Sequence, residues 1–310
     1  MKRAVSVLLS AALMLSVLTG CGKSGSVSKK NIPAEETAAS KKIALSDSGI
    51  TVDGAAISDD ETAAVYAAQD IVYYEEGQGV AYGAGTDADA HSQEEADAHT
   101  VVHITQPGTY TLSGTLSAGQ IAVDLGDGAE EDPEAVVTIV LDGVDITCTV
   151  APAIIFYRVY ECGSADMETA TQTVDTSAAG ANVVIADGTE NRVTGSHVAK
   201  IYKPESVTLN ADGTAVEETK KLHKYDGALY SKMSMNIGGE SEGDGVLNIT
   251  GENEGLDTEL HLTINGGVIN IQAQDDGINV NEDGVSVVTV NGGTLQINAG
   301  LGAEGDGIDS

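Results

Sequence analysis

The clearest pattern in the chain is an alternation of apolar and polar positions in its last third. The tetrads Val-Leu-Asn-Ile, Val-Ile-Asn-Ile and Thr-Leu-Gln-Ile begin at residues 246, 268 and 294, so they recur at similar intervals. A period of two is typical of a half-buried β-strand, and no helical period spans the segment. The pattern therefore predicts short strands that repeat along the chain.

A second phrase, an acidic residue followed by glycine, lies between these strands. Its glycines are Gly227, Gly255, Gly277 and Gly307, at intervals similar to those of the tetrads. Asn-Gly-Gly at residues 265 and 291 marks tight turns, because asparagine and glycine accept a positive φ. One strand-and-turn unit per repeat predicts an all-β solenoid, a parallel β-helix with rungs about 4.8 Å apart. A propeller blade needs four antiparallel strands in about 40–45 residues and fits less well.

Stacked rungs place equivalent acidic residues above one another. A first column is expected to contain Asp226, Glu254, Asp276 and Asp306, and a second to contain Leu229, Asp257, Asn279 and Asp309. Close carboxylates disfavour one another's charge. A Ca²⁺ ion, which takes six to eight oxygen ligands, would remove the conflict. The alternative is that these residues occupy solvated turns and only keep the protein soluble.

The N-terminus predicts export and a lipid anchor. Lys2 and Arg3 precede a short apolar run, and Leu-Thr-Gly-Cys ends at Cys21. This segment resembles bacterial lipoprotein signals, which implies a signal peptide over residues 1–20 and lipid attachment at Cys21, on the extracellular face of the cell membrane. Residues 21–42 are polar and predict a flexible tether.

The remaining chain divides into a weakly patterned part and a strand-rich part. Residues 43–99 are assigned to an N-terminal cap region, and strand patterns with Gly or Pro breaks run over residues 100–310. Segments 158–180 and 200–224 are expected to be excursions from the repeats. Cys148 and Cys162 allow either a disulfide or two free thiols.

Charge limits the classes of partner. The chain has a formal net charge of −33, and the segment after Lys232 contains fourteen Asp and Glu and no Lys or Arg. Nucleic acid is excluded, because its binding depends on neutralising phosphates. The membrane is expected to be a partner only through the lipid anchor at Cys21. The acidic segment favours cations, and it favours an anionic ligand only through a bridging cation.

Several motifs together resemble a bacterial cell-surface carbohydrate-binding family. They are Gly-Thr-Tyr-Thr-Leu-Ser-Gly-Thr-Leu at 108, Val-Leu-Asp-Gly-Val-Asp-Ile-Thr at 140, Asp-Gly-Ala-Leu-Tyr-Ser-Lys at 226 and Leu-Thr-Ile-Asn-Gly-Gly at 262. The resemblance covers residues 100–310. It implies a polysaccharide-lyase-like right-handed β-helix without catalytic activity, which binds cell-wall polysaccharide, either cellulose or acidic pectin, with calcium. The acidic positions that it carries over are Asp275, Asp276, Asn279, Asp306 and Asp309.

Two other functions compete with the binding module. A calcium-dependent polyuronate lyase would need a base, for which Lys224 and Lys232 are the nearby candidates. A structural adhesin or surface spacer needs no ligand site. Tyr225 and Tyr230 flank the first acidic phrase and are candidate sugar contacts, or alternatively cover turn edges. Because the chain stops inside a rung without a polar cap, further rungs are expected beyond Ser310.

Overall fold

The computed structural model describes residues 40–73, 91–163, 166–202, 207–218, 221–300 and 305–310. Nearly all regular structure in these residues is β-strand, which confirms the predicted all-β class; the exceptions are α1 (Gln93–Asp97) and a 3-10 turn, Ala129–Glu131. None of the described helices is long and apolar enough to span a membrane. The predicted signal peptide and Cys21 lie outside the described residues. The boundary expected after residue 42 falls inside β1, which begins at Ser40.

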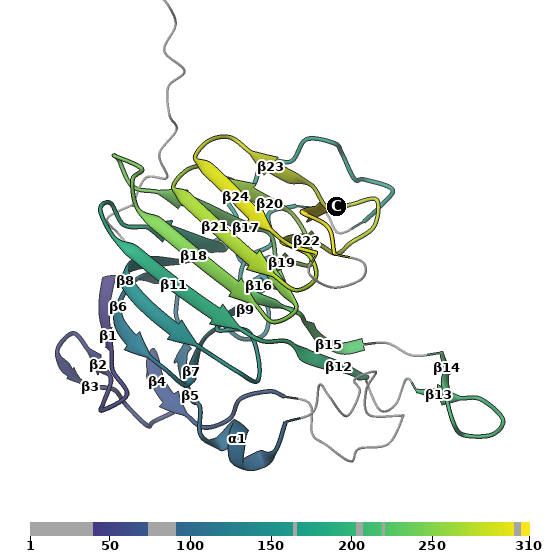
Figure 1. Ribbon diagram of the computed structural model, residues 1–310, viewed down its shortest axis with the longest axis horizontal. Coiled ribbons are helices and arrows are strands. Elements are labelled where there is room, and N and C mark those ends of the chain that lie inside the picture. The colour runs from purple at the N-terminus through teal and green to yellow at the C-terminus, as the bar shows by residue number, and fades with distance from the viewer. Residues whose placement is uncertain (1–39, 74–90, 164–165, 203–206, 219–220, 301–304) are drawn as a thin grey trace, which may run out of the picture.

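The strands form three ladders, and from β6 onward each circuit of the chain adds one parallel strand to each ladder (Figure 1). The first ladder contains β1 (Ser40–Leu45), the first halves of β6 (Gly108–Leu116) and β8 (Val137–Thr147), β10 (Ala181–Ile185), β17 (Met235–Gly239), β20 (Leu262–Ile264) and β23 (Val288–Val290). The second ladder contains the second halves of β6 and β8, β11 (Glu190–Gly195), β18 (Val246–Gly251), β21 (Val268–Ala273) and β24 (Thr294–Asn298). The third ladder contains β4 (Val65–Ala68), β5 (Thr100–Ile104), β7 (Gly119–Asp124), β9 (Ile154–Arg158), β16 (Gly227–Ser231), β19 (Glu254–Thr258), β22 (Ile278–Val280) and β25 (Ile308–Asp309).

Two glycines lie at the bends where β6 and β8 pass from the first ladder to the second. β6 and β8 each pass from one ladder to the next without a break, and each contains a glycine at the bend: Gly114 with φ 93° and Gly143 with φ 76°. Residues with a Cβ rarely adopt this left-handed region. In later circuits a turn separates the two strands instead, and Gly267 and Gly293 take positive φ there, as the Asn-Gly-Gly pattern predicts.

The remaining strands lie outside the ladders. β2 (Thr51–Val52) pairs antiparallel with β1 and with β3 (Ala55–Ala56). Between β11 and β16 the chain leaves the ladders for two antiparallel pairs, β12 (Val198–Tyr202) with β15 (Lys221–Tyr225) and β13 (Thr208–Leu209) with β14 (Val216–Glu218). These pairs occupy the predicted excursion at residues 200–224.

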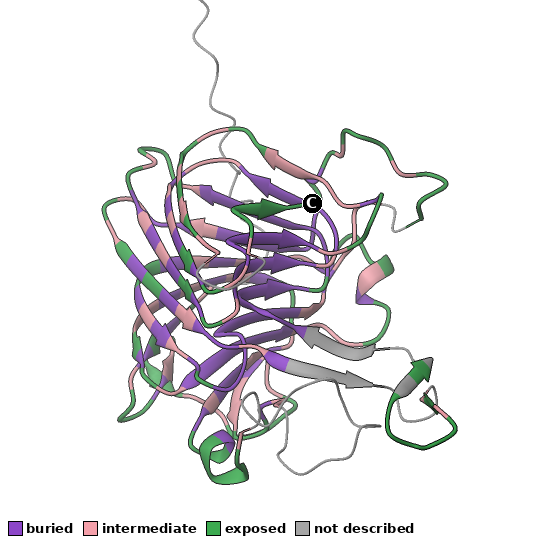
Figure 2. Cartoon of the chain, turned by 45° about the vertical axis from the view of Figure 1, so that its right-hand side comes forward, coloured by how far each residue is buried: buried purple, intermediate pink, exposed green. Residues whose placement is uncertain are grey.

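The core fills the space between the ladders. In β18, Leu247 and Ile249 are buried while Asn248 between them is half-buried, so the alternation seen in the sequence separates interior from exterior. Figure 2 shows buried strands through the middle of the molecule and exposed residues in the turns. Both described cysteines are free thiols: Cys148 is buried in the core and Cys162 is half-buried.

The glycine of the recurring phrase is required by packing between circuits. A Cβ at Gly277 would meet the Ile297 Cγ2 atom and would lie 2.8 Å from the Gly307 carbonyl oxygen. A Cβ at Gly255 would likewise meet the Ile271 Cγ2 atom and would lie 2.7 Å from the Gly277 carbonyl oxygen. Carbon and oxygen atoms do not approach so closely without displacement of the backbone. The repeat of this glycine is therefore explained by close approach at the corner between the second and third ladders.

We expect Gly277→Ala to lower the free energy of unfolding by about 1–3 kcal/mol, because the new methyl group overpacks the corner. Gly307→Ala is the matched control, since a Cβ there has nothing within 4 Å; its effect is expected to stay within about 0.5 kcal/mol. Urea unfolding followed by circular dichroism measures both. Equal stability of the two variants would contradict the packing explanation.

Candidate functional site

One row of side chains crosses the third ladder on the face that points away from the space between the ladders, and its members Ala122, Ile155 and Tyr230 are buried there by other segments. Leu256 and Ile278 point into the core, and the two-residue period of a strand directs Asp257 and Asn279 the other way. Strand register joins Tyr66, His103, Ala122, Ile155, Tyr230, Asp257, Asn279 and Asp309 into this row. The row is aromatic or apolar over the earlier strands and acidic or amide over the last three. Its polar part marks the candidate site.

The polar part of the row and the acidic residues around it form what we term the acidic end. Its members are Glu254, Asp257, Asp275, Asp276, Asn279, Asp306 and Asp309. Asp257 has no exposed surface, Glu254 is 4% exposed and Asp276 is 9% exposed. Asp306 and Asp309 are exposed. Buried carboxylates are costly unless hydrogen-bonded or paired with a cation.

Asparagine amides separate the carboxylates of successive strands. Asn279 Nδ2 donates to Glu254 Oε1 at 2.8 Å, and Asn281 Nδ2 donates to Asp257 Oδ1 at 2.5 Å. Each amide comes from the next strand along the ladder or the residue just after it. Each amide thus satisfies one oxygen of a buried carboxyl group.

Asp276 lies where this compensation is incomplete. Burial raises the pKa of its carboxyl group, and the negative charges of Asp275, Asp309 and Asp306 raise it further. One hydrogen bond acts in the opposite direction, from the Asp306 backbone N–H to Asp276 Oδ1 at 2.6 Å. Positive charge at this position would therefore be favourable.

The strand register corrects both predicted columns at their first member. Gly227, not Asp226, pairs with Glu254, and Tyr230, not Leu229, pairs with Asp257. Leu229 pairs with Leu256 and belongs to the core. The reason is Ala228, an extra residue between glycine and leucine in the first phrase. Asp226 is buried one position before the strand, outside the column in which it was expected.

The predicted sugar contacts, Tyr225 and Tyr230, are both buried. Tyr225 is 4% exposed and Tyr230 is 1% exposed, so neither presents a ring face to a ligand. Their rings pack edge to face with centroids 5.0 Å apart, and Tyr157 packs on Tyr225 at 5.3 Å. Burial raises the pKa of both hydroxyls, and Tyr230 donates to Glu259 Oε1 at 2.7 Å. The alternative structural role is the one that the geometry supports.

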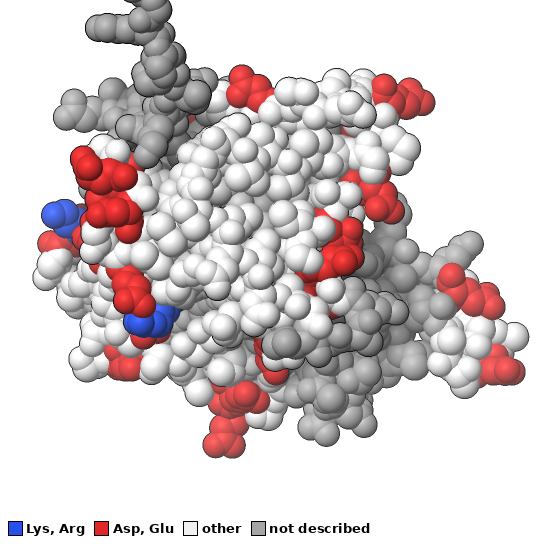
Figure 3. All heavy atoms as spheres, turned by 45° about the horizontal axis from the view of Figure 1, so that its top comes forward, with Lys and Arg blue, Asp and Glu red and all other residues white. Residues whose placement is uncertain are grey.

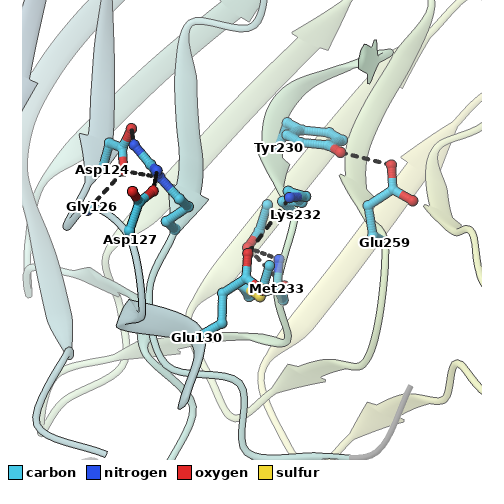
Figure 4. Close-up of polar contacts among 10 residues, drawn as sticks. Asp124, Gly126, Asp127, Glu130, Tyr230, Lys232, Met233 and Glu259 are labelled. Carbon is cyan, nitrogen blue, oxygen red and sulfur yellow. Dashed lines mark hydrogen bonds and ion pairs between the residues drawn. The ribbon is translucent and has the colours of Figure 1, made fainter. Parts of the chain in front are cut away.

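Polar and charged side chains also lie at the ends of the third-ladder strands, and Figure 4 shows the contacts of Asp124, Lys232 and Glu259 among them. Register places Asp124 opposite Arg158, and backbone hydrogen bonds continue the later strands so that Lys232, Glu259 and Asn281 follow one another. Arg158 Nε and Nη2 donate to the two oxygens of Asp124 at 2.6 and 2.7 Å, and Nη1 bonds Asp127. Lys232 Nζ lies 3.6 Å from Glu130 Oε1. Both cations are therefore held by carboxylates.

Sequence reasoning did not identify Asn281, Glu259 or Arg158. A usable signal was present for two of them, because Lys232, Glu259 and Asn281 lie 27 and 22 residues apart (259−232, 281−259), close to the 28 and 22 between the first three acidic phrases. These intervals are also the offsets between the paired strands β16, β19 and β22. Arg158 carried no such signal, since a register shift between β7 and β9 sets its position.

The acidic end contains the types of oxygen ligand that calcium prefers, but these ligands do not converge on one point. Its donors are carboxylate and amide oxygens, which calcium prefers, and the raised pKa of Asp276 favours a cation. Yet in the part of the chain that the structure describes, no three His, Cys, Asp or Glu side chains converge closely enough to hold a metal ion. Calcium therefore stays a prediction.

Comparison with known proteins points to one family. A family model described as "Carbohydrate-binding domain-containing protein" matches residues 98–310. A relative of the same description from Acetivibrio thermocellus is 31% identical over 173 residues, which is 56% of this chain and 45% of the relative. The chain thus spans about half the length of that relative. A solved structure, the "polysaccharide lyase-like protein from C. thermocellum, Gadolinium derivative", is 22% identical, with a TM-score of 0.44 and coverage of 84% and 83% of the two chains. That likeness is too low to carry an argument.

Without divalent cations, we expect Asp276→Asn to reduce the loss of stability as the pH rises. A raised folded-state pKa means that the folded protein binds more protons than the unfolded chain above the ordinary Asp pKa of 3.8. Stability is then highest below that pKa and falls as pH rises through the folded value. Thermal melts from pH 3.5 to 7 measure this. Asp47 is the opposite case, because the hydrogen bonds from Ser117 lower its pKa; Asp47→Asn should lower stability at neutral pH. A pH profile unchanged by Asp276→Asn would contradict the assignment.

Proposed function

The chain belongs to the family of carbohydrate-binding domain-containing proteins, and we propose that it binds acidic cell-wall polysaccharide through calcium at the acidic end. The family match over residues 98–310 carries the carbohydrate part of this proposal. The buried, stacked carboxylates of the third ladder carry the calcium part.

The same proposal includes the architecture. Three ladders that each gain a parallel strand per circuit correspond to the coils of a parallel β-helix, which we take to be right-handed, in keeping with the usual hand of parallel crossovers. In such a coil, equivalent side chains repeat in line along the axis. The acidic end is then one stretch of a continuous surface running parallel to the axis.

Charge explains why a bridging cation is needed. The formal net charge is −33, so a polyuronate would be repelled by the protein alone. Calcium would supply a positive centre that accepts oxygens from both the protein and the glycan. Asp276, Asn279, Asp306 and Asp309 are the residues we expect to hold it, because Asp306 and Asp309 are exposed on the same ladder as the buried Asp276. Glu254 and Asp257 would position the side chains of Asn279 and Asn281 by accepting hydrogen bonds from their amide groups.

We propose that the protein is not an enzyme. A lyase needs a base that can accept a proton beside the calcium-bound substrate. Ion pairing with Asp124 raises the pKa of Arg158 and holds its proton. Lys232 pairs with Glu130 and lies at the strand end, away from the acidic end, and the side chain of Lys224 lies outside the described residues. The alternative function as a lyase is tested directly by measuring product formation. If no ligand binds, the alternative function as an adhesin or surface spacer is favoured.

The cellular location belongs to the same proposal. Lipid attachment at Cys21 and residues 21–39 ahead of β1 would hold the ladders outside the cell, where polysaccharide is found.

We expect calcium to raise the melting temperature of the full-length chain by about 5 °C at roughly 100 times its dissociation constant, since preferential binding to the folded state contributes about 2.7 kcal/mol. Asp276→Asn and Asp309→Asn should each weaken binding about tenfold or more in calorimetric titration. Asp59→Asn, at an exposed position outside the ladders, is the control with the same charge change. Calcium binding that is equal in all three variants would place the ion elsewhere.

Polygalacturonate should bind in the presence of calcium and be released by EDTA. Affinity electrophoresis with the polymer in the gel measures this, with Asp59→Asn retarded like the wild type and Asp276→Asn less retarded. Absorbance of unsaturated uronate in the same mixtures should stay constant with time. A steady increase would replace the binding module by a lyase, and no retardation with or without calcium would leave the adhesin.

A further inference from the structure

Two Asn-Gly steps, Asn265-Gly266 and Asn291-Gly292, form equivalent corners in successive circuits. Each follows a strand of the first ladder and precedes a strand of the second: β20 and β21 for the first step, β23 and β24 for the second. Their local sequences, Ile-Asn-Gly-Gly-Val and Val-Asn-Gly-Gly-Thr, are nearly the same. Neither step belongs to the acidic end or to the calcium proposal.

An asparagine followed by glycine can convert itself to an acid without an enzyme. The backbone nitrogen of the glycine attacks the asparagine Cγ atom, so a new C–N bond forms and the Cγ–Nδ2 bond breaks. Ammonia leaves with the proton of the glycine N–H group, and a five-membered succinimide ring remains. Water then adds to either carbonyl of the ring and opens it to aspartate or isoaspartate. Glycine favours the attack because it has no Cβ to hinder the approach.

The attacking nitrogen is available at both corners. Among the described residues, none accepts a backbone hydrogen bond from the N–H group of Gly266 or Gly292. Asn270 differs, because Ile271 follows it inside the paired strand β21, where backbone N–H groups are engaged in the ladder. The corner asparagines are therefore set apart from those within strands.

Exposure and packing distinguish the two corners from each other. Asn291 is exposed, whereas Asn265 is half-buried. The first corner is also packed on both sides: a Cβ at Gly266 would lie 3.4 Å from Gly239 N, and a Cβ at Gly292 would lie 3.0 Å from the Asn265 carbonyl oxygen. Asn291 Nδ2 donates to Asn265 Oδ1 at 2.9 Å, which holds the Asn265 side chain in one orientation.

We propose that the Asn291-Gly292 corner is a self-modification site, at which Asn291 converts to aspartate or isoaspartate and thereby releases Asn265 to react in turn. Asn291 reacts first because its side chain is exposed and free to turn toward Gly292 N. The product carboxylate has no N–H to donate, so the hydrogen bond to Asn265 Oδ1 is lost. The Asn265 Cγ atom then gains the freedom to approach Gly266 N.

Conversion changes both the charge and the length of the main chain at the corner. The second-ladder strands β21 and β24 contain no charged residue, and Figure 3 shows a broad surface without Asp, Glu, Lys or Arg. A new carboxylate next to β24 therefore alters the local charge. Isoaspartate also adds one methylene to the main chain, beside Gly293, where a Cβ would already lie 2.6 Å from the Gly267 carbonyl oxygen.

Ageing of the full-length protein in mildly alkaline buffer tests the order of the two conversions. Water enriched in heavy oxygen labels each new carboxylate, and peptide mapping by mass spectrometry follows the two asparagines separately. We expect Asn291 to convert several-fold faster than Asn265 in the folded protein. In urea the two should convert at equal rates, because their local sequences are nearly the same.

A substitution at the outer corner tests the release step. In Asn291→Asp, Asn265 should convert about fivefold faster than in the wild type, the factor that corresponds to a hydrogen bond of about 1 kcal/mol. Asn270→Asp is the matched control: it makes the same change and removes the same kind of bond, from Asn270 Nδ2 to Asn248 Oδ1 at 2.9 Å. Asn265 should convert in this variant as it does in the wild type.

Each other outcome counts against the inference. Equal rates at the two corners of the folded wild type, or faster conversion of Asn265, would overturn the order. No conversion at either corner of the folded protein, while both convert in urea, would overturn the site itself. Conversion of Asn265 that Asn291→Asp leaves unchanged, or that Asn270→Asp accelerates equally, would overturn the release step.

Discussion

Backbone hydrogen bonding between successive circuits is the constraint on which the rest of this structure depends. Parallel strands in register place each side chain beside its counterpart in the next circuit, about 4.8 Å away. In the interior this produces continuous apolar contacts, such as Leu256 with Ile278 and Ile237 with Ile264. It also leaves room only for glycine where one circuit turns against the next, as at Gly277.

The same register has a cost where the stacked residues are acidic. At the end of the third ladder, amide groups partly offset the repulsion between carboxylates, since Asn279 and Asn281 donate hydrogen bonds to carboxylates of the preceding strand. Asp276 is where this is not enough, because burial and three neighbouring acids raise its pKa. Stacking of acidic residues in register therefore concentrates negative charge around Asp276.

Two faces of one scaffold differ in chemistry although both are built from repeated strands. The third ladder gathers carboxylates, aromatic rings and ion pairs, and part of it is buried, as Asp257 and Tyr230 show. In the second ladder, the outward side chains of β18, β21 and β24 are half-buried or exposed, and none of them is charged.

The strand content and the repeat were readable from the chain alone, because both depend on short-range patterns: alternation in residues 246–249 and its copies, and glycine at each corner. Residues of the acidic end could be named for the same reason. Register could not be read, since one extra residue, Ala228, moves Asp226 and Leu229 out of their expected columns. Burial could not be read either, because it depends on distant segments. Tyr225, from the excursion, packs against Tyr230, and a register shift places Arg158 beside Asp124. Local pattern specifies which residues form strands, whereas packing between circuits specifies which of their side chains are buried and which lie side by side.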